Sequence, residues 1–258
     1  MDTVGPLLDA LFRWVHVAFG VLWMGLLYFF SFVGGPFIES LDMDSRKAVI
    51  RGLMPRASFW ATVGGFATYI TGLLLLGLIF YHPSGIANVA SAVILVVTLI
   101  AGPFIYDMLA KSSVAKTPFL FAAIGFVLMA VFLLLMIYWG DFGYRRANIH
   151  MGTMLGSILV FNGIFRIKPA QMKVLDALKA GSAPDPSQMA LFMQRMRHNA
   201  YISLPLLWTM ISSHTGVLAS GTLGMTEKTW WIGFLVIVLI GWHSVTMLYR
   251  RASKLKGV

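Results

Sequence analysis

The chain has 258 residues, of which 58% are hydrophobic and only 12% are charged. A soluble domain has about 45–50% apolar and about 25% charged residues, so this composition excludes an ordinary soluble enzyme, a disordered chain and a nucleic-acid-binding module. The net charge of +10 lies in loops between apolar stretches, where it sets membrane orientation. Because cysteine is absent, disulfides, iron–sulfur clusters with cysteine ligands and covalently attached haem c are also excluded.

Seven apolar stretches are long enough, or nearly so, to cross a bilayer, which requires about 20 residues per helix. The sequence therefore predicts an all-α polytopic membrane helix bundle that forms one integral membrane domain over residues 1–258. The first stretch lacks a basic leading segment and a small-residue cleavage site, so we interpret it as a retained helix. The predicted spans lie near residues 11–33, 59–81, 88–108, 119–139, 148–167, 200–220 and 230–249.

The basic residues predict an orientation with the N-terminus outside and the C-terminus inside. In that orientation all but four of the 20 Lys and Arg residues lie on the inner side, as the positive-inside rule requires. The four outer residues are Arg13, Arg145, Arg146 and Lys228. The inner loop at 168–199 is long, and its helical spacing predicts two short amphipathic segments lying at the cytoplasmic surface.

Histidines are the ionisable residues that stand out within these spans. His16, His150 and His214 are all expected near the outer face, and His243 lies deeper in the last span. Ionisable groups at membrane depth are costly and are functional candidates by default. His82 and His198 are expected at the two membrane interfaces instead.

Two histidines at similar depth on facing helices could ligate one haem b, because neutral imidazole is a common axial ligand. We therefore predict haem b held by two of His16, His150 and His214, with His243 as a further cofactor-binding candidate. The alternative is that each histidine forms a hydrogen bond between helices. Asn162 and Asn199 have the same two interpretations, as substrate ligands or as interhelical hydrogen-bonding groups.

Several sequence blocks resemble the membrane domain of bacterial membrane-bound urate oxidase (urate hydroxylase). These blocks are Arg13-Trp14-Val15-His16-Val17 with Gly20 and Trp23-Met24-Gly25, Met54-Pro55-Arg56-Ala57 with Gly64 and Thr71-Gly72, Gly152-Thr153-Met154 with Asn162, Ile167-Lys168-Pro169-Ala170-Gln171, and Arg195-Met196-Arg197-His198-Asn199 continuing through Pro205 to Ser213-His214. In that family the membrane domain precedes a C-terminal cytochrome c domain. This sequence ends at Val258 and has no cysteine, so we expect a separate electron acceptor, either a cytochrome c, another redox subunit or a quinone.

Three functions remain open from the sequence. The first is a haem-b redox protein of the bacterial inner membrane that exchanges electrons with a partner protein or quinone. The second is a urate oxidase-like enzyme that uses a separate cytochrome c; urate is an anion, and Arg13, Arg145 and Arg146 could form a basic pocket at the outer face. The third is a non-catalytic anchor or accessory subunit of a larger complex. The sequence thus leaves open whether the chain is an oxidoreductase or an electron-transfer subunit.

Overall fold

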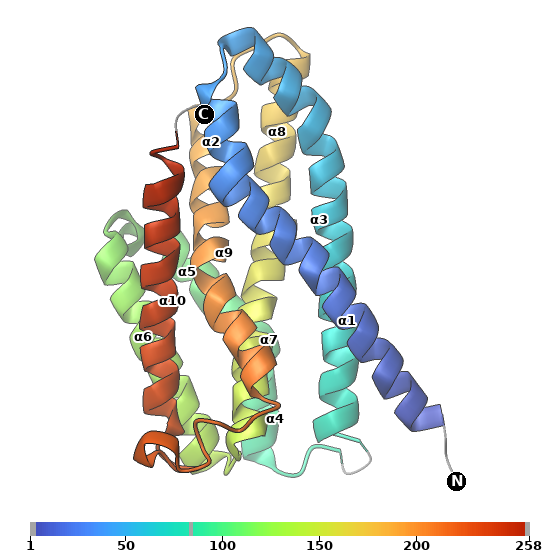
Figure 1. Cartoon of the computed structure of the whole chain (residues 1–258), viewed down its shortest axis with the longest axis vertical. Coiled ribbons are helices and arrows are strands. Elements are labelled where there is room, and N and C mark those ends of the chain that lie inside the picture. The colour runs from blue at the N-terminus through green and yellow to red at the C-terminus, as the bar shows by residue number, and fades with distance from the viewer. Residues whose placement is uncertain (1–3, 83–84, 256–258) are drawn as a thin grey trace. The chain divides into compact units, whose positions relative to one another are not determined.

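The computed structural model describes residues 4–82 and 85–255, and these residues contain helices but no strand. The elements are α1 (Val4–Phe29), η1 (Phe30–Gly34), α2 (Gly35–Ser40), α3 (Met43–Phe80), α4 (Val89–Val96), η2 (Val97–Ala101), α5 (Gly102–Lys111), η3 (Ser113–Lys116), α6 (Pro118–Leu134), η4 (Leu135–Trp139), α7 (Tyr144–Asn162), η5 (Gly163–Ile167), α8 (Lys168–Lys179), α9 (Pro186–Ser212), η6 (Thr222–Gly224) and α10 (Trp230–Ala252) (Figure 1). The predicted all-α class is confirmed.

Within the described residues, six helices are long and apolar enough to cross a membrane. The remaining predicted span, at residues 200–220, overlaps α9, which is long but is not among the six. Between residues 198 and 210 of α9 every residue is buried or half-buried. A helix covered by protein does not need a lipid-facing apolar surface, so α9 can carry polar side chains such as Ser203 and Thr209.

Three proline residues follow π-helical turns inside long helices. The turns η1, η2 and η5 each end two residues before a proline, at Pro36, Pro103 and Pro169, respectively. Proline lacks a backbone N–H donor, and its ring clashes with the carbonyl one turn earlier. A π turn before the proline accommodates both changes without ending the helix. The helices therefore continue through the prolines as apolar rods, at Gly5–Ser40, Val89–Lys111 and Tyr144–Lys179.

This continuity changes the expectation for residues 168–199. We expected two short segments separate from the spans, but α8 continues α7 through η5, and residues 186–199 are the first half of α9. The 36-residue rod Tyr144–Lys179 is about 54 Å long, against a hydrocarbon core of about 30 Å. The continuous helix is therefore longer than one membrane crossing requires.

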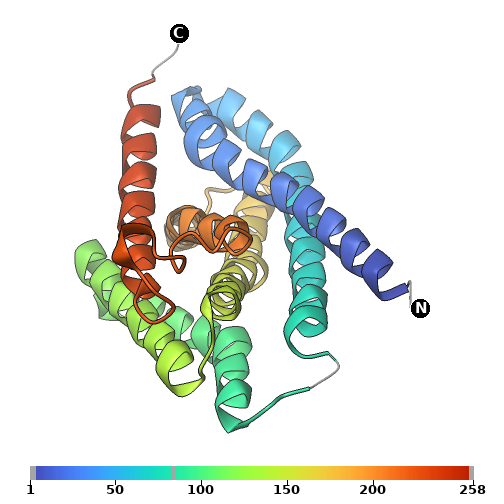
Figure 2. The same ribbon diagram turned by 60° about the horizontal axis from the view of Figure 1, so that its bottom comes forward.

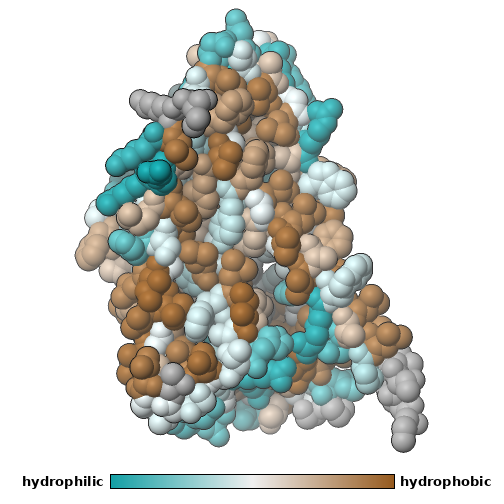
Figure 3. Space-filling view, viewed as in Figure 1, coloured by the Kyte–Doolittle hydropathy of each residue, from teal (hydrophilic) through white to brown (hydrophobic). Residues whose placement is uncertain are grey.

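The chain divides into two compact units. Unit 1 contains the described parts of residues 1–75, 159–203 and 242–258, and unit 2 those of residues 76–158 and 204–241. In unit 1, α1 lies beside α3, and α8 lies beside the first half of α9 (Figures 1 and 2). Hydrophilic residues gather at the end of unit 1 that carries α2 (Figure 3).

Unit 1 is held together partly by long-range polar contacts near its hydrophilic end. The Arg51 guanidinium donates to the Leu178 carbonyl at the end of α8, and the Gln171 amide lies 3.5 Å from the Met54 sulfur. The Tyr28 hydroxyl is 2.8 Å from the Ser203 hydroxyl, which joins α1 to α9. These contacts align the α1, α3, α8 and α9 segments that enclose the pocket described below.

Candidate functional site

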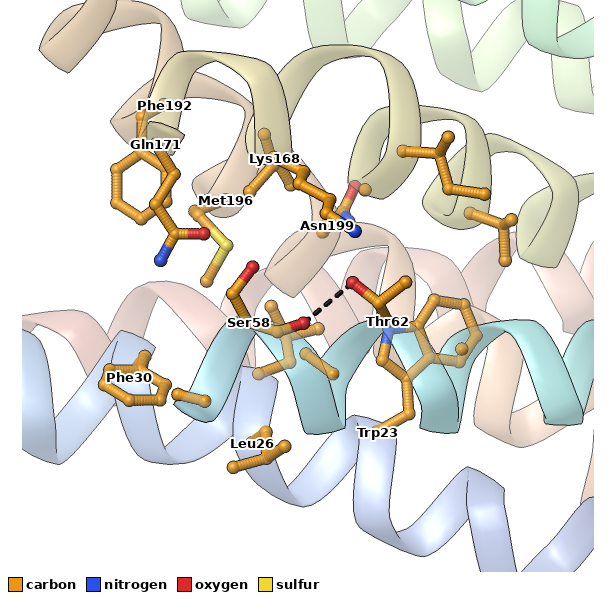
Figure 4. Close-up of a pocket in the computed structure, with 18 of the residues that line it drawn as sticks. Trp23, Leu26, Phe30, Ser58, Thr62, Lys168, Gln171, Phe192, Met196 and Asn199 are labelled. Carbon is orange, nitrogen blue, oxygen red and sulfur yellow. Dashed lines mark hydrogen bonds between the residues drawn. The ribbon is translucent and has the colours of Figure 1, made fainter. Parts of the chain in front are cut away.

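A pocket lies inside unit 1, between α1, α3, the rod formed by α7, η5 and α8, and α9 (Figure 4). Its volume is ≈ 100 Å³, which is enough for a small planar molecule or several waters. Of its lining residues, Phe66 and Ile164 have exposed apolar side chains, and Lys168 is also exposed. The pocket therefore opens between α3 and the η5–α8 segment. The lining residues are Trp23, Leu26, Leu27, Phe30, Met54, Ala57, Ser58, Ala61, Thr62, Gly65, Phe66, Val160, Gly163, Ile164, Ile167, Lys168, Gln171, Phe192, Met196 and Asn199.

The indole of Trp23 forms one wall of the pocket, and a glycine pair on α3 makes room for it. A methyl group added at Gly65 would lie 3.0 Å from Cε2 and 3.1 Å from Nε1 of Trp23. One added at Gly64 would lie 3.2 Å from Trp23 Cβ. Two adjacent residues without side chains thus let α1 and α3 pack closely and fix the plane of an aromatic ring at the pocket.

Polar groups line two facing sides of the pocket. Figure 4 shows Lys168 and Asn199 on the side that faces Ser58 and Thr62. The Thr62 hydroxyl donates to the Ser58 carbonyl at 2.7 Å, an ordinary bond to the preceding helical turn, and keeps its lone pairs as acceptors. The pocket thus combines an apolar, aromatic wall with one cation and several groups able to donate or accept hydrogen bonds, as small-molecule sites do.

A buried polar network lies behind Asn199. The Arg195 side chain is 0% exposed, and its Nη1 donates to Asn162 Oδ1 at 3.3 Å. Asn162 Nδ2 donates to Asn199 Oδ1 at 2.8 Å, and Asn199 Nδ2 donates to the Leu159 carbonyl at 3.3 Å. The two asparagines therefore make the hydrogen bonds between helices that were one of their two predicted roles, and Asn199 also lines the pocket.

His16 lies in unit 1 on α1, half-buried against α3. Its Nδ1 is 2.8 Å from the Thr68 carbonyl and 3.3 Å from the Thr71 hydroxyl. Since a carbonyl only accepts, Nδ1 carries the proton in the neutral ring and Nε2 is the nitrogen left to bind another group. A methyl group at Gly72 would lie 2.9 Å from His16 Cε1, so this glycine provides the space for the ring.

His150 lies in unit 2 on α7 and is 0% exposed. Its Nδ1 donates to the Arg146 carbonyl at 2.7 Å, so Nε2 is the acceptor for the Tyr81 hydroxyl, also at 2.7 Å. The rings of Phe80, Tyr81 and Phe142 lie with their centroids 5.0–5.8 Å from the imidazole. Both ring nitrogens are therefore engaged within the protein, as in the interhelical alternative.

The structure corrects the expected position of His214. The helix predicted to continue to residue 220 ends at Ser212, and His214 lies in the following turn with an exposed side chain. The Ser212 carbonyl accepts from the Gly216 N–H at 3.3 Å, and Gly216 has φ +59°, a conformation that favours glycine and ends helices. His243 is on α10 in unit 1, and its side chain is exposed as well.

The three arginines predicted for a basic outer pocket have other contacts or are exposed. Arg13 Nε pairs with the Asp9 carboxylate at 2.7 Å, one turn earlier on α1. The Arg146 guanidinium stacks over the Phe142 ring at 4.0 Å and the Tyr81 ring at 5.3 Å. Arg145 is exposed at the start of α7. Among the residues that the structure describes, no group of three or more His, Cys, Asp or Glu side chains could hold a metal ion.

A family model described as urate oxidase N-terminal matches residues 44–254. The chain belongs to the urate oxidase N-terminal family. The matched region includes most of the pocket lining and the whole Arg195–Asn162–Asn199 network. No curated protein and no solved structure gives a match. Together with the six long apolar helices, membership of the urate oxidase N-terminal family identifies a multi-pass membrane protein related to urate oxidase.

Sequence reasoning concentrated on histidines and therefore missed most of the pocket. Ser58, Thr62 and Gln171 carry no distinctive motif, and only their convergence in space makes them a site. A signal was nevertheless present, because Arg195 and Asn199 stand in the block that most resembles the urate oxidase N-terminal family. An arginine one helical turn before an asparagine, at the start of an apolar stretch, indicated a polar group that the fold has to bury.

Proposed function

We propose that this protein is a urate oxidase-like oxidoreductase of the bacterial inner membrane, which binds urate or a related oxopurine in the unit 1 pocket. The observation that carries this proposal is the pocket's combination of Trp23, Lys168 and several hydrogen-bonding side chains in a member of the urate oxidase N-terminal family. This proposal moves the substrate from the outer arginines to a pocket that lies, in the predicted orientation, toward the inner face.

The residues match the chemistry of such a ligand. Urate is a planar anion whose ring atoms and carbonyl groups need both stacking and hydrogen bonds. The Trp23 indole offers a flat aromatic wall, and Lys168 at the mouth attracts an anion. Ser58, Thr62 and Gln171 supply donors and acceptors around the ligand. Fixing the ring plane and orienting the ligand are what this chain's residues contribute to an oxidation.

Oxidation of urate releases electrons, so the reaction requires an acceptor. We propose a separate cytochrome c or other redox subunit, with a membrane quinone as the alternative acceptor. In either case the acceptor takes the electrons, while the pocket residues hold the substrate and accept hydrogen bonds from its N–H groups.

Haem b remains a hypothesis for the redox group. A haem bound by His150 would require Nε2 to exchange its hydrogen bond with Tyr81 for iron, so the observed arrangement of His150 does not fit an axial ligand. His16 retains Nε2, but the exposed His214 lies beyond the end of its helix. For this reason we assign no step of the reaction to haem. If bound, haem would supply one-electron transfer.

The proposal is tested by urate-dependent reduction of added cytochrome c, and of a soluble quinone, by the purified protein. Lys168→Gln should raise KM for urate about tenfold, as expected for loss of an interaction worth about 1.4 kcal/mol. Lys173→Gln removes an exposed charge from the same helix, α8, outside the pocket, and should leave KM unchanged. Absence of urate binding by the wild-type protein in calorimetry would refute the proposed function.

A dithionite-reduced minus oxidised visible spectrum tests the haem hypothesis separately. A b-type α-band that disappears in two of the variants His16→Ala, His150→Ala and His214→Ala would identify the axial pair. A flat spectrum from intact protein, expressed with haem supplied, would eliminate haem b without affecting the urate proposal.

A further inference from the structure

We propose that Arg195 makes the unit 1 pocket selective for an anionic ligand, acting through Asn162 and Asn199 as a positioning residue. This inference rests on the proposed function, because it concerns the ligand class of the same pocket. Arg195 does not line the pocket itself, whereas Asn199, one helical turn later on α9, does. Arg195 can therefore act on a ligand only through the residues that lie between it and the pocket.

Arg195 places a cation in the interior of unit 1. Its side chain is 0% exposed, although placing a guanidinium out of water costs several kcal/mol unless polar groups surround it. An arginine is always protonated, so this position holds a permanent positive charge inside unit 1. Water and salt screen a buried charge much less than an exposed one, so its field extends further into the surrounding protein.

The hydrogen bonds that start at Arg195 fix the orientation of both asparagine side chains. Because arginine only donates, Asn162 must present its Oδ1 to Arg195 and its amide hydrogens away from it. Asn162 Nδ2 then donates to Asn199 Oδ1, which turns the amide hydrogens of Asn199 away from the cation as well. Both amide dipoles thus point their positive ends in the same sense, away from Arg195. Aligned dipoles of this kind polarise one another and strengthen the chain.

The hydrogen-bonded series leads from Arg195 to a residue of the pocket wall. Asn199 is buried and stands in the pocket wall, next to Lys168 in Figure 4. One amide hydrogen of Asn199 is donated to the Leu159 carbonyl at 3.3 Å, and the amide nitrogen carries a second one. The positive potential of Arg195 and of the two amides therefore reaches the pocket wall through Asn199. Lys168 is exposed and attracts any anion from solution, but its field is screened. The buried network is better placed to distinguish a bound anion from a neutral molecule of similar shape.

The experiment compares two oxopurines by calorimetry with the full-length protein in detergent at pH 7. Urate is an anion at this pH, and hypoxanthine is neutral. Arg195→Gln should weaken urate binding about tenfold and change hypoxanthine binding less than about twofold, because only the anion loses a charge interaction. Arg195→Lys should restore most of the urate affinity. Lys173→Gln, which removes an exposed charge, is the matched control and should bind urate like the wild type.

Asn162→Leu provides a second variant that keeps the Arg195 charge but removes the hydrogen bonds that link it to Asn199. This variant should also weaken urate binding more than hypoxanthine binding. Thermal melting verifies that each variant is folded. Equal weakening of both ligands in the folded variants, or unchanged urate binding in both, would overturn the role of Arg195. If the wild-type protein binds neither ligand, the proposed function itself fails, and this inference fails with it.

Discussion

At the scale of single residues, Gly65 is the position where one methyl group should alter the pocket without disturbing the fold. A Cβ at Gly65 would lie 3.0 Å from the Trp23 ring, closer than ordinary van der Waals contact, so Gly65→Ala should shift the indole. We expect weaker urate binding, by about fivefold to tenfold, which corresponds to about 1 kcal/mol. Calorimetry measures the affinity.

Gly77→Ala is the control for this substitution. Gly77 also lies in α3, and a Cβ there has nothing within 4 Å, so this variant should bind urate normally. Equal affinity of the Gly65→Ala protein and the wild type would show that the Trp23 ring does not contribute to the site.

The hydrogen bond between Tyr81 and His150 gives a prediction of stability. Tyr81→Phe would leave the Nε2 atom of a fully buried imidazole without its observed donor. An unsatisfied buried acceptor costs about 1–3 kcal/mol, so the melting temperature should fall. Tyr138→Phe removes an exposed hydroxyl that donates to the Lys228 carbonyl, and its melting temperature should change little. Similar melting of both variants would mean that water replaces Tyr81 at His150.

At the scale of helices, the start of α9 should carry a pH-dependent contribution to stability. Asp185 precedes Pro186 and accepts from the backbone N–H and the hydroxyl of Ser187, both at 2.8 Å. These hydrogen bonds lower the pKa of Asp185 below its usual value near 3.8. A carboxyl group with a lowered folded-state pKa stabilises the protein above its unfolded-state pKa, and this contribution disappears as the pH falls through the folded-state value.

Asp185→Ala should therefore lower the melting temperature at pH 7, by about 2 °C for the loss of one helix cap. The difference from the wild type should shrink progressively below a pH of about 4. Melting curves of both proteins between pH 3 and pH 7 provide the measurement. A constant difference over this range would mean that the Asp185 charge does not contribute.

The helices also show how much of the fold was predictable. Composition and the length of the apolar stretches were sufficient to predict the all-α class. In lipid, a helix makes all the backbone hydrogen bonds of such a stretch within the stretch itself. The predicted spans ended at residues 33 and 167, within η1 and at the end of η5, whereas the helices continue there as α2 and α8. A π turn permits this continuation through local geometry that single-residue preferences do not encode.

The candidate site was less predictable for a different reason. Helical spacing predicts the depth of His150 or Asn199 in the membrane, but it does not predict which helices are neighbours. The partners of His150, which are the Tyr81 hydroxyl and the Arg146 carbonyl, decide whether its nitrogens are available. Likewise, Asn162 and Asn199 are 37 positions apart in the sequence and become one network only because α7 lies beside α9 (Figure 2).

At the scale of the whole molecule, the predicted orientation can be tested directly because the chain contains no cysteine. A cysteine at Ala183, in the turn between α8 and α9, should be on the cytoplasmic side. A cysteine at Ala87, in the loop between α3 and α4, should be on the opposite side. Both positions are exposed, so neither substitution should affect folding.

In intact cells, a membrane-impermeant maleimide should label Ala87→Cys and should reach Ala183→Cys only after the membrane is opened. The physical reason is the excess of Lys and Arg on the side that carries the α8–α9 turn, which the positive-inside rule keeps in the cytoplasm. The reverse pattern would place the mouth of the unit 1 pocket, with Lys168, on the outer side. The urate that this pocket is proposed to bind would then have to come from outside the cell, and electron acceptors on that side would become the ones to test.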